Sequence, residues 1–318
     1  MTLPIIDISP LQSDDREDWK PVITQIDAAC RDLGFFYVVG HGIPQEQFDH
    51  IEYTADQFFG LPVKEKQKIS IENSKNHRGW GRLAAEKLDP NGQADCKETF
   101  DMALDLSPFH SQVERCPKLY GPNQYPELSG FVQSVNQHYT LTLDVGMRVL
   151  KAMALALNEP EDFFTKYFRL SVSVLRLLHY PSQSQVTNGA GAHTDYGCIT
   201  LLYQDNSGGL QLLNKQNQWI DAPPVPGSFV VNIGDLMQRW TNDIYRSTQH
   251  RVSNPISGKS RFSMPFFVEP DFDTPVETLT SCIEQKPGEG GYPSITAGEW
   301  IISCFEGTYE YLREPEND

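Results

Sequence analysis

A series of short strand patterns separated by turns constrains the fold of this chain most strongly. After Leu170 the apolar residues no longer recur at helical spacing, and they gather in brief segments bounded by glycine, proline, asparagine and aspartate. The predicted strands are residues 171–180, 199–204, 210–213, 229–233, 249–252 and 260–268. Because many short strands in succession favour a sandwich or barrel over alternating βαβ units, we expect a mainly β protein with a double-sheet core and peripheral helices.

The two segments in which we identify helical spacing come before these strands. Apolar residues recur at this spacing from Val22 to Leu33, and Gly34 follows as a C-terminal stop before a predicted strand at residues 35–39. A longer amphipathic pattern covers residues 129–157. We expect this long helix to be a scaffold that packs against the β core.

The 318 residues contain no internal repeat, no low-complexity segment and no Pro/Gly/Ser linker long enough to separate two domains. The sequence therefore predicts a single compact unit over residues 1–318. Within this unit, an N-terminal region at residues 3–115 precedes a second region at residues 116–318. The second region holds the long helix and the strand-rich core at about residues 170–270.

Charge and composition argue against several classes of partner. The formal net charge is −16 and the acidic residues are spread along the chain, so nucleic acid is not expected to bind. The opening segment does not resemble a signal peptide and no apolar run could cross a bilayer, which favours a cytoplasmic protein with no membrane contact. The six cysteines lie far apart and are interpreted as buried free thiols. The sequence leaves the oligomeric state open, and a monomer is compatible with it.

Three residues have the spacing and chemistry of a metal site. His193 and Asp195 stand two residues apart, so in an extended segment both side chains project from one face. His250 lies in a separate strand-like segment and can supply a third ligand. Two histidines and one carboxylate form the facial triad of non-haem iron(II) oxygenases, which leaves open positions on one side of the metal. Taken alone, a His-x-Asp pair is more typical of two exposed loop residues.

A second set of residues is suited to binding an anion. Arg261 and Ser263 alternate onto one face of the predicted strand at 260–268, and a guanidinium directed into a small β core needs a carboxylate partner. That partner is either a bound ligand or an internal aspartate or glutamate. Tyr180 ends the strand at 171–180 and either donates its hydroxyl to a metal-bound ligand or packs as an ordinary aromatic.

Further motifs resemble the isopenicillin N synthase-like branch of the iron(II)/2-oxoglutarate-dependent dioxygenases, in the order of that family. They are Pro-Ile-Ile-Asp at 4–7, the segment 34–44, Arg-Gly-Trp at 78–80, Lys-Glu-Thr-Phe-Asp at 97–101, His-Thr-Asp-Tyr-Gly at 193–197, Gly-Gly-Leu-Gln at 208–211, Asn-Ile-Gly-Asp at 232–235, His-Arg-Val at 250–252 and Arg-Phe-Ser at 261–263. The resemblance therefore covers nearly the whole chain.

The resemblance implies a distorted jelly roll, or double-stranded β-helix, preceded at residues 3–115 by the N-terminal region of such dioxygenases. It implies Fe(II), 2-oxoglutarate and dioxygen as cofactor and cosubstrates. Arg261 and Ser263 would bind the distal carboxylate of 2-oxoglutarate, and Tyr180 matches the family's tyrosine on the strand before the metal pair. One departure is Leu178, where many relatives have an asparagine.

The activity implied is oxidation of a small molecule by hydroxylation, desaturation or cyclisation, with release of succinate and CO2. Two alternatives remain at this stage: an oxidase like isopenicillin N synthase itself, which uses no 2-oxoglutarate, and a non-catalytic ligand-binding module on the same fold. The sequence does not identify the substrate. From their proximity to motifs, the candidate substrate contacts are Tyr196, Arg78, Glu86 and Phe266.

Overall fold

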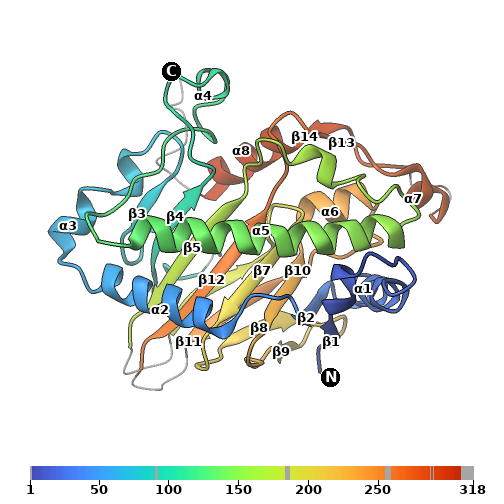
Figure 1. Ribbon diagram of the computed structural model, residues 1–318, viewed down its shortest axis with the longest axis horizontal. Coiled ribbons are helices and arrows are strands. Elements are labelled where there is room, and N and C mark those ends of the chain that lie inside the picture. Colours follow the sequence, from blue (N-terminus) through green and yellow to red (C-terminus); the bar gives the residue numbers. More distant parts are fainter. Residues whose placement is uncertain are drawn as a thin grey trace.

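The computed structural model of the chain describes residues 2–89, 92–182, 187–254, 259–286, 288 and 290–308. Within these residues the strands form an eight-stranded sheet, a four-stranded sheet and a small two-stranded sheet. Figure 1 shows the long helix α5 lying across the large sheet, with further helices around the periphery. The expected mainly β architecture with peripheral helices is confirmed, as is the distorted jelly roll.

The large sheet joins strands from both halves of the chain. In spatial order it contains β1 (Ile5–Asp7), β2 (Phe35–Val39), β10 (Phe229–Ile233), β7 (Ile199–Gln204), β12 (Arg261–Val268), β5 (Val174–Tyr180), β4 (Glu98–Ala103) and β3 (Gly79–Gly81). The four-stranded sheet contains β6 (Thr187–His193), β11 (His250–Asn254), β8 (Leu210–Leu213) and β9 (Trp219–Asp221). The remaining pair is β13 (Pro275–Val276) and β14 (Ile295–Thr296).

The helices lie mainly before β5 and after β12. They are α1 (Lys20–Asp32), α2 (Gln45–Phe59), α3 (Val63–Gln67), α4 (Ser111–Arg115), α5 (Phe131–Ala156), α6 (Asp235–Trp240), α7 (Thr280–Glu284) and α8 (Ala297–Thr308), with short 3-10 turns η1 (Ser9–Gln12), η2 (Ile71–Asn73) and η3 (Thr165–Tyr167). None of the helices in the described part of the chain is long and apolar enough to cross a membrane.

Four strand predictions have the bounds that the structure shows. The strands expected at 35–39, 199–204, 210–213 and 229–233 have those bounds as β2, β7, β8 and β10. The other three expected strands are present with ends shifted by one to three residues, as β5, β11 and β12. The long helix expected at 129–157 is α5 at Phe131–Ala156.

Several strands were not predicted from the sequence. β6 has the sequence Thr-Asn-Gly-Ala-Gly-Ala-His, in which threonine alone favours strands, and it forms because β11 pairs with it in antiparallel register. The N-terminal region contributes β1, β2, β3 and β4 to both ends of the large sheet. The expected division at residue 115 stays a prediction.

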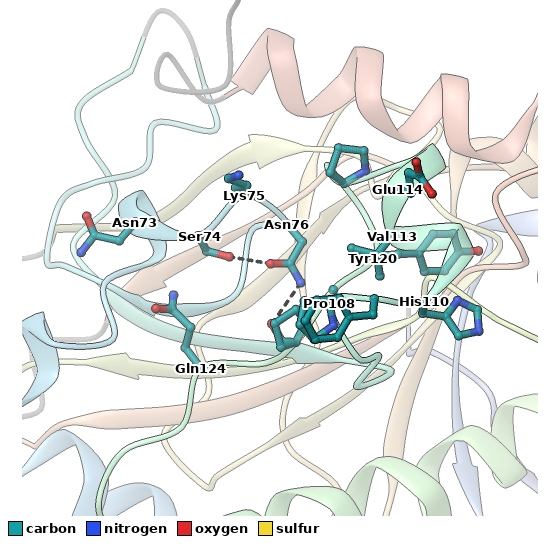
Figure 2. A pocket seen from close by; sticks show the side chains of 14 residues that line it. Asn73, Ser74, Lys75, Asn76, Pro108, His110, Val113, Glu114, Tyr120 and Gln124 are labelled. Carbon is teal, nitrogen blue, oxygen red and sulfur yellow. Dashed lines mark hydrogen bonds between the residues drawn. The ribbon is translucent and has the colours of Figure 1, made fainter.

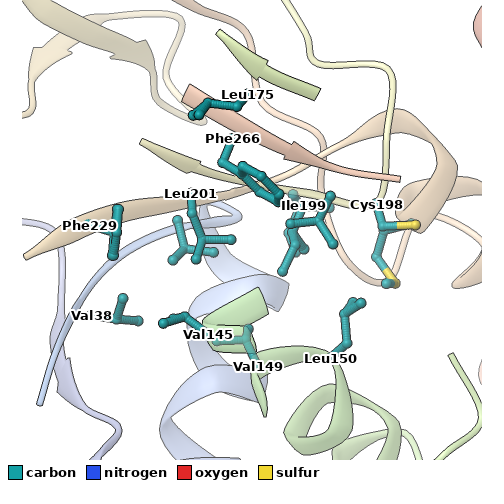
Figure 3. Packing of buried hydrophobic residues seen from close by; sticks show 14 of the residues in the cluster. Val38, Val145, Val149, Leu150, Leu175, Cys198, Ile199, Leu201, Phe229 and Phe266 are labelled. Carbon is teal, nitrogen blue, oxygen red and sulfur yellow. The ribbon is translucent and has the colours of Figure 1, made fainter. Parts of the chain in front are cut away.

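The large sheet separates a hydrophobic core from a cavity lined by charged and apolar side chains. Side chains on one face of β7 and β12 pack against α5, and Figure 3 shows Phe266, Ile199 and Leu201 in this cluster with Val145 and Val149 of the helix. The opposite face, together with the four-stranded sheet, lines a cavity. Successive residues of β12 alternate between these two environments, as strand geometry requires.

Gly34 connects the helical layer to the sheet and sets the position of β2. It adopts φ +67, and a Cβ at this position would lie 1.9 Å from the carbonyl oxygen of Arg246. The next residue, Phe35, packs its ring edge-on against His250, with ring centroids 5.4 Å apart. The close approach of two backbone segments at Gly34 therefore helps to place a predicted metal ligand.

We expect Gly34→Ala to lower the free energy of unfolding by about 2–5 kcal/mol, because it combines a left-handed conformation with a backbone clash. Gly130→Ala is the matched control, since Gly130 has φ +79 but a Cβ there meets no heavy atom within 4 Å. The control should lose about 1–2 kcal/mol from backbone strain alone. Urea denaturation measures both losses, and equal losses would contradict a role for the close approach.

Candidate metal centre

The three predicted metal ligands converge at one end of the cavity. His193 is the last residue of β6, His250 is the first residue of β11, and the two are paired directly across these antiparallel strands. Asp195 lies two residues beyond β6, and its Oδ1 is 3.7 Å from Nε2 of His193 and 3.6 Å from Nε2 of His250. Ligand atoms of the three residues all lie within 4.8 Å of one another, a separation that one metal ion can bridge.

Hydrogen bonds orient each of these side chains toward the shared point. Nδ1 of His193 donates to the carbonyl of Gly191 (2.7 Å) and Nδ1 of His250 donates to the carbonyl of Thr248 (3.1 Å). Because a carbonyl can only accept, both rings keep Nε2 available for a metal.

The carboxylate of Asp195 is held by two donors at its other oxygen. Oδ2 accepts hydrogen bonds from Thr200 Oγ1 (2.5 Å) and from Asn232 Nδ2 (2.7 Å), so Oδ1 faces the histidines. Asn232 lies on β10 and Thr200 on β7, both strands of the large sheet. Side chains from the eight-stranded sheet therefore orient Asp195, a predicted metal ligand that follows β6 of the four-stranded sheet.

Burial and mutual electrostatics set the protonation of the three residues. Burial and the neighbouring His250 lower the pKa of His193 to about 3. Burial alone would raise the pKa of Asp195, but the two histidines outweigh it and hold that pKa below its ordinary value. Burial alone would lower the pKa of His250, yet the Asp195 carboxylate raises it. A divalent cation bound here would favour neutral imidazoles and an ionised Asp195, so protons would be released as it binds.

A buried cation lies at the far end of the same cavity. Arg261 is 2% exposed and its Nη1 donates to Ser263 Oγ (2.8 Å), while its Nε donates to the carbonyl of Gly208 (2.7 Å). Its guanidinium also lies 4.7 Å from the ring centroid of Tyr180. No carboxylate in the described part of the chain pairs with Arg261. The internal salt bridge considered from the sequence is therefore not found among these residues, and the site can accept an external anion.

One cavity connects the metal ligands with this cation. It is lined by His193, Asp195, His250, Arg261, Ser263, Tyr180, Leu178, Lys97, Arg176, Thr200, Asn232, Phe267 and six further residues. Leu178, the departure from the family pattern noted in the sequence, presents an apolar side chain to this cavity. Lys97, Arg176 and Phe267 were not among the predicted site residues, although the alternation of Arg176 with Tyr180 along one face of β5 is visible in the sequence.

A second cavity meets the first at His193 and Asp195. Tyr196, Phe267, Glu269 and Phe305 line it, together with Arg176 and other residues. Phe305 comes from α8, and the hydroxyl of Tyr196 is hydrogen-bonded to Thr308 of the same helix (2.5 Å). The C-terminal helix therefore forms part of the wall beside the metal ligands.

The charged residues around the two cavities form a nearly closed network. Arg176 makes a bidentate pair with Asp101, at 2.7 Å for both hydrogen bonds, and contacts Glu86 at 3.0 Å. Lys97 pairs with Glu86 (3.1 Å) and with Asp95 (2.8 Å). These pairs fix the position of Arg176 beside the metal ligands.

The four predicted substrate contacts occupy different environments. Tyr196 lines the second cavity, and Glu86 lies behind it as a partner of Arg176. Arg78 is buried and donates to the carbonyls of Asn76, His77 and Leu119, away from both cavity walls.

The assignment of Phe266 to the substrate is wrong. Phe266 lies on the face of β12 opposite Arg261 and packs against Tyr139 of α5, with ring centroids 5.0 Å apart. Its neighbour Phe267 lines both cavities instead, because side chains alternate along a strand.

A wider hollow of about 700 Å³ lies on another part of the molecule. Figure 2 shows its polar lining, which includes Asn76, His110, Glu114 and Gln124. Among the residues that the structure describes, the triad of His193, Asp195 and His250 is the one cluster with metal-ligating geometry. Size alone therefore does not identify the functional site.

The sequence matches two described families. Residues 3–128 match the N-terminal region of the non-haem dioxygenase in morphine synthesis, and residues 171–270 match the 2OG-Fe(II) oxygenase superfamily. The chain is 35% identical to the 2-oxoglutarate-Fe(II) type oxidoreductase hxnY of Emericella nidulans, over 96% of this chain and 90% of that protein. It is 36% identical to the homoarginine-6-hydroxylase 2-ODD-C23.1 of Arabidopsis thaliana, over 95% of this chain and 96% of that protein.

Solved structures agree with the sequence matches. A full-length Neurospora crassa protein in complex with alpha-KG superposes with a TM-score of 0.85 at 27% identity, over 96% of each chain. The complex of the same protein with alpha-KG and thymine superposes with a TM-score of 0.82 at 28% identity, again over 96% of each chain.

We expect Asn232→Ala to weaken divalent-metal binding by about 10–100-fold, because Asp195 loses one of the two donors that orient it. Competition against a chelator measures this affinity. Asn214→Ala is the control, since Asn214 is also buried but accepts hydrogen bonds within the turn between β8 and β9. An unchanged metal affinity in Asn232→Ala would show that Thr200 alone orients the carboxylate.

Proposed function

Because the chain belongs to the 2OG-Fe(II) oxygenase superfamily, we propose that His193, Asp195 and His250 bind its iron(II) and that Arg261 and Ser263 bind 2-oxoglutarate. The protein is an iron(II)- and 2-oxoglutarate-dependent oxygenase. The observation that carries the residue assignment is a single cavity with the convergent triad at one end. At its other end lies a buried arginine that has no carboxylate partner among the described residues.

The residues of the first cavity fit the cosubstrate from end to end. The distal carboxylate of 2-oxoglutarate would accept hydrogen bonds from the Arg261 guanidinium and the Ser263 hydroxyl. Tyr180 holds the guanidinium in place through its ring, and its position in the cavity wall supports its assignment to the same subsite. Leu178 and Phe267 add apolar surface to the cavity wall.

The second cavity is proposed to hold the substrate that is oxidised. It shares His193 and Asp195 with the first cavity, as well as Arg176, Leu88 and Phe267, so a molecule bound there would lie beside the metal ligands. Iron(II) with 2-oxoglutarate and dioxygen supplies the oxidising chemistry, with release of succinate and CO2. The protein's own contribution is to orient a C–H bond of the substrate and to keep water out.

We further propose that the substrate is a small molecule and that the protein belongs to the isopenicillin N synthase-like branch. The ordered motifs from residue 4 to residue 263 support the branch. A net charge of −16 disfavours a nucleic-acid polymer as substrate. All six cysteines are free thiols, which supports the proposed cytoplasmic location.

Each of His193→Ala, Asp195→Ala and His250→Ala is expected to reduce bound iron(II) from about one ion per chain to a small fraction, because two ligands hold the metal poorly. Metal analysis after dialysis measures the content, and circular dichroism checks that each variant is folded. His50→Ala is the control, since His50 is exposed on α2. Full iron content in any of the three variants would remove that residue from the ligand set.

Arg261→Leu is expected to weaken 2-oxoglutarate binding by about 2–5 kcal/mol, because a buried carboxylate then faces an apolar side chain. Ser263→Ala should cost less, since it removes one neutral hydrogen bond. Calorimetry with an inert metal in place of iron measures both affinities. Arg251→Leu is the matched control, because Arg251 stacks on Trp219 and does not line the cavity.

Equal 2-oxoglutarate affinity in wild type and Arg261→Leu would contradict the assignment of the carboxylate site. Succinate release provides a separate test of the reaction. An oxidase that uses no 2-oxoglutarate would consume dioxygen and substrate without forming succinate, whereas the proposed reaction forms one succinate for each substrate oxidised.

A further inference from the structure

One buried carboxyl beside the metal ligands is left without a partner in the described part of the chain. Glu269 is 4% exposed and lines the second cavity, and its side chain makes no hydrogen bond or ion pair with any described residue. The other buried carboxylates nearby are paired, Asp101 and Glu86 with Arg176 and Asp95 with Lys97. A buried carboxyl without a partner is energetically unfavourable. We therefore expect a ligand bound in the cavity to pair with it.

The backbone around Glu269 holds this side chain in place. Its backbone N–H donates to Ser173 Oγ (3.0 Å), and the Ser173 hydroxyl donates back to its carbonyl (3.1 Å). The side chain then crosses Gly197, where a Cβ would lie only 2.7 Å from Glu269 Cγ. Glycine at this position, two residues after the ligand Asp195, allows the carboxyl to reach the cavity.

The cations close to Glu269 are already engaged elsewhere. Arg78 donates to three backbone carbonyls, and Arg176 is held by Asp101 and Glu86. Burial therefore raises the pKa of Glu269 to about 8, against the opposing effect of these guanidiniums. A positively charged group that entered the cavity could pair with the Glu269 carboxyl, which no described residue pairs with.

The charges of the residues around the second cavity indicate the charge of the group that would bind beside Glu269. Arg176, which lines both cavities, is paired with Asp101 and Glu86. Among the described residues that line the second cavity, Glu269 is a carboxyl with no cationic partner of its own. A bound group of positive charge would supply that partner when Glu269 is ionised.

The remaining walls of the second cavity suit the same kind of group. The aromatic rings of Tyr196, Phe267 and Phe305 line it, and aromatic faces attract cations that have left water. The acidic protein also favours the approach of cations over anions.

We propose that Glu269 recognises a protonated nitrogen, an amine or guanidine, on the substrate. This inference rests on the proposed function, since it places the substrate in the cavity that meets the first one at His193 and Asp195. The cation and the ionised carboxyl form a buried pair, and the aromatic walls enclose it. A neutral substrate with an imide edge, which would bind the protonated carboxyl instead, is the competing outcome.

The test uses the full chain with zinc(II) in place of iron, saturated with 2-oxoglutarate, and calorimetry with matched pairs of probes. n-Butylguanidine is compared with n-butylurea, which has a neutral ureido group in place of the guanidine, and n-butylamine with 1-butanol, so that neither neutral partner carries a protonated nitrogen. Thymine serves as the neutral imide. In wild type we expect at least one cation to bind about 30-fold or more tightly than its neutral partner.

Glu269→Gln keeps the shape of the side chain and removes its charge, so the preference for the cation should fall to within about threefold. Glu269→Asp should retain part of the preference, because the charge remains on a shorter side chain. Glu277→Gln is the control for overall charge, since Glu277 is exposed, and it should keep the wild-type preference. The wild-type probe pairs test the proposal even if Glu269→Gln fails to fold.

Binding of 2-oxoglutarate to the zinc(II) protein is measured in the same series. Its absence would overturn the proposed function, and the inference with it. If 2-oxoglutarate binds, the inference alone is overturned by any of three results: no cation binds more tightly than its neutral partner, thymine binds more tightly than every cation, or Glu269→Gln keeps the wild-type preference.

Discussion

His193 and His250 face each other across β6 and β11, and the metal centre depends on this pairing. The antiparallel register brings two residues that are distant in sequence to a ring-centroid separation of 4.3 Å. Asp195 completes the set because Thr200 and Asn232, from the large sheet, turn its carboxylate toward the histidines. A shift of one residue in the β6–β11 register would send one imidazole to the opposite face and abolish the triad.

Buried charge is the second constraint, because an ion removed from water must be paired. The protein satisfies this rule around Arg176 and Lys97 with its own carboxylates. Within the described residues it leaves Arg261 and Glu269 without charged partners, one in each cavity. These two groups have opposite signs and lie in the cavities assigned to the cosubstrate and the substrate, so each is available to select its ligand by charge.

Predictions from the sequence were accurate where the alternation of residues along a strand assigns side chains to one face of that strand. Alternation along β12 placed Arg261 and Ser263 together, and the same alternation argues against Phe266, which shares the face of Phe262 and Met264 and packs on α5. Arg78 was chosen only for its proximity to a motif, and its guanidinium binds backbone carbonyls. The contributions of β3, β4 and β6 were not foreseen, because their pairing partners lie far away in the chain.

The sequence by itself determined the β-rich class, the long scaffold helix and the identity of the candidate metal and carboxylate ligands, since these follow from residue type and short-range periodicity. Only the tertiary structure decided which charges are paired and which are not. Lys97 and Arg176 meet their carboxylates through contacts between different strands and loops, whereas Glu269 follows β12 and reaches the cavity across Gly197. Pairing of buried charges depends on three-dimensional proximity, which no local pattern of residues encodes.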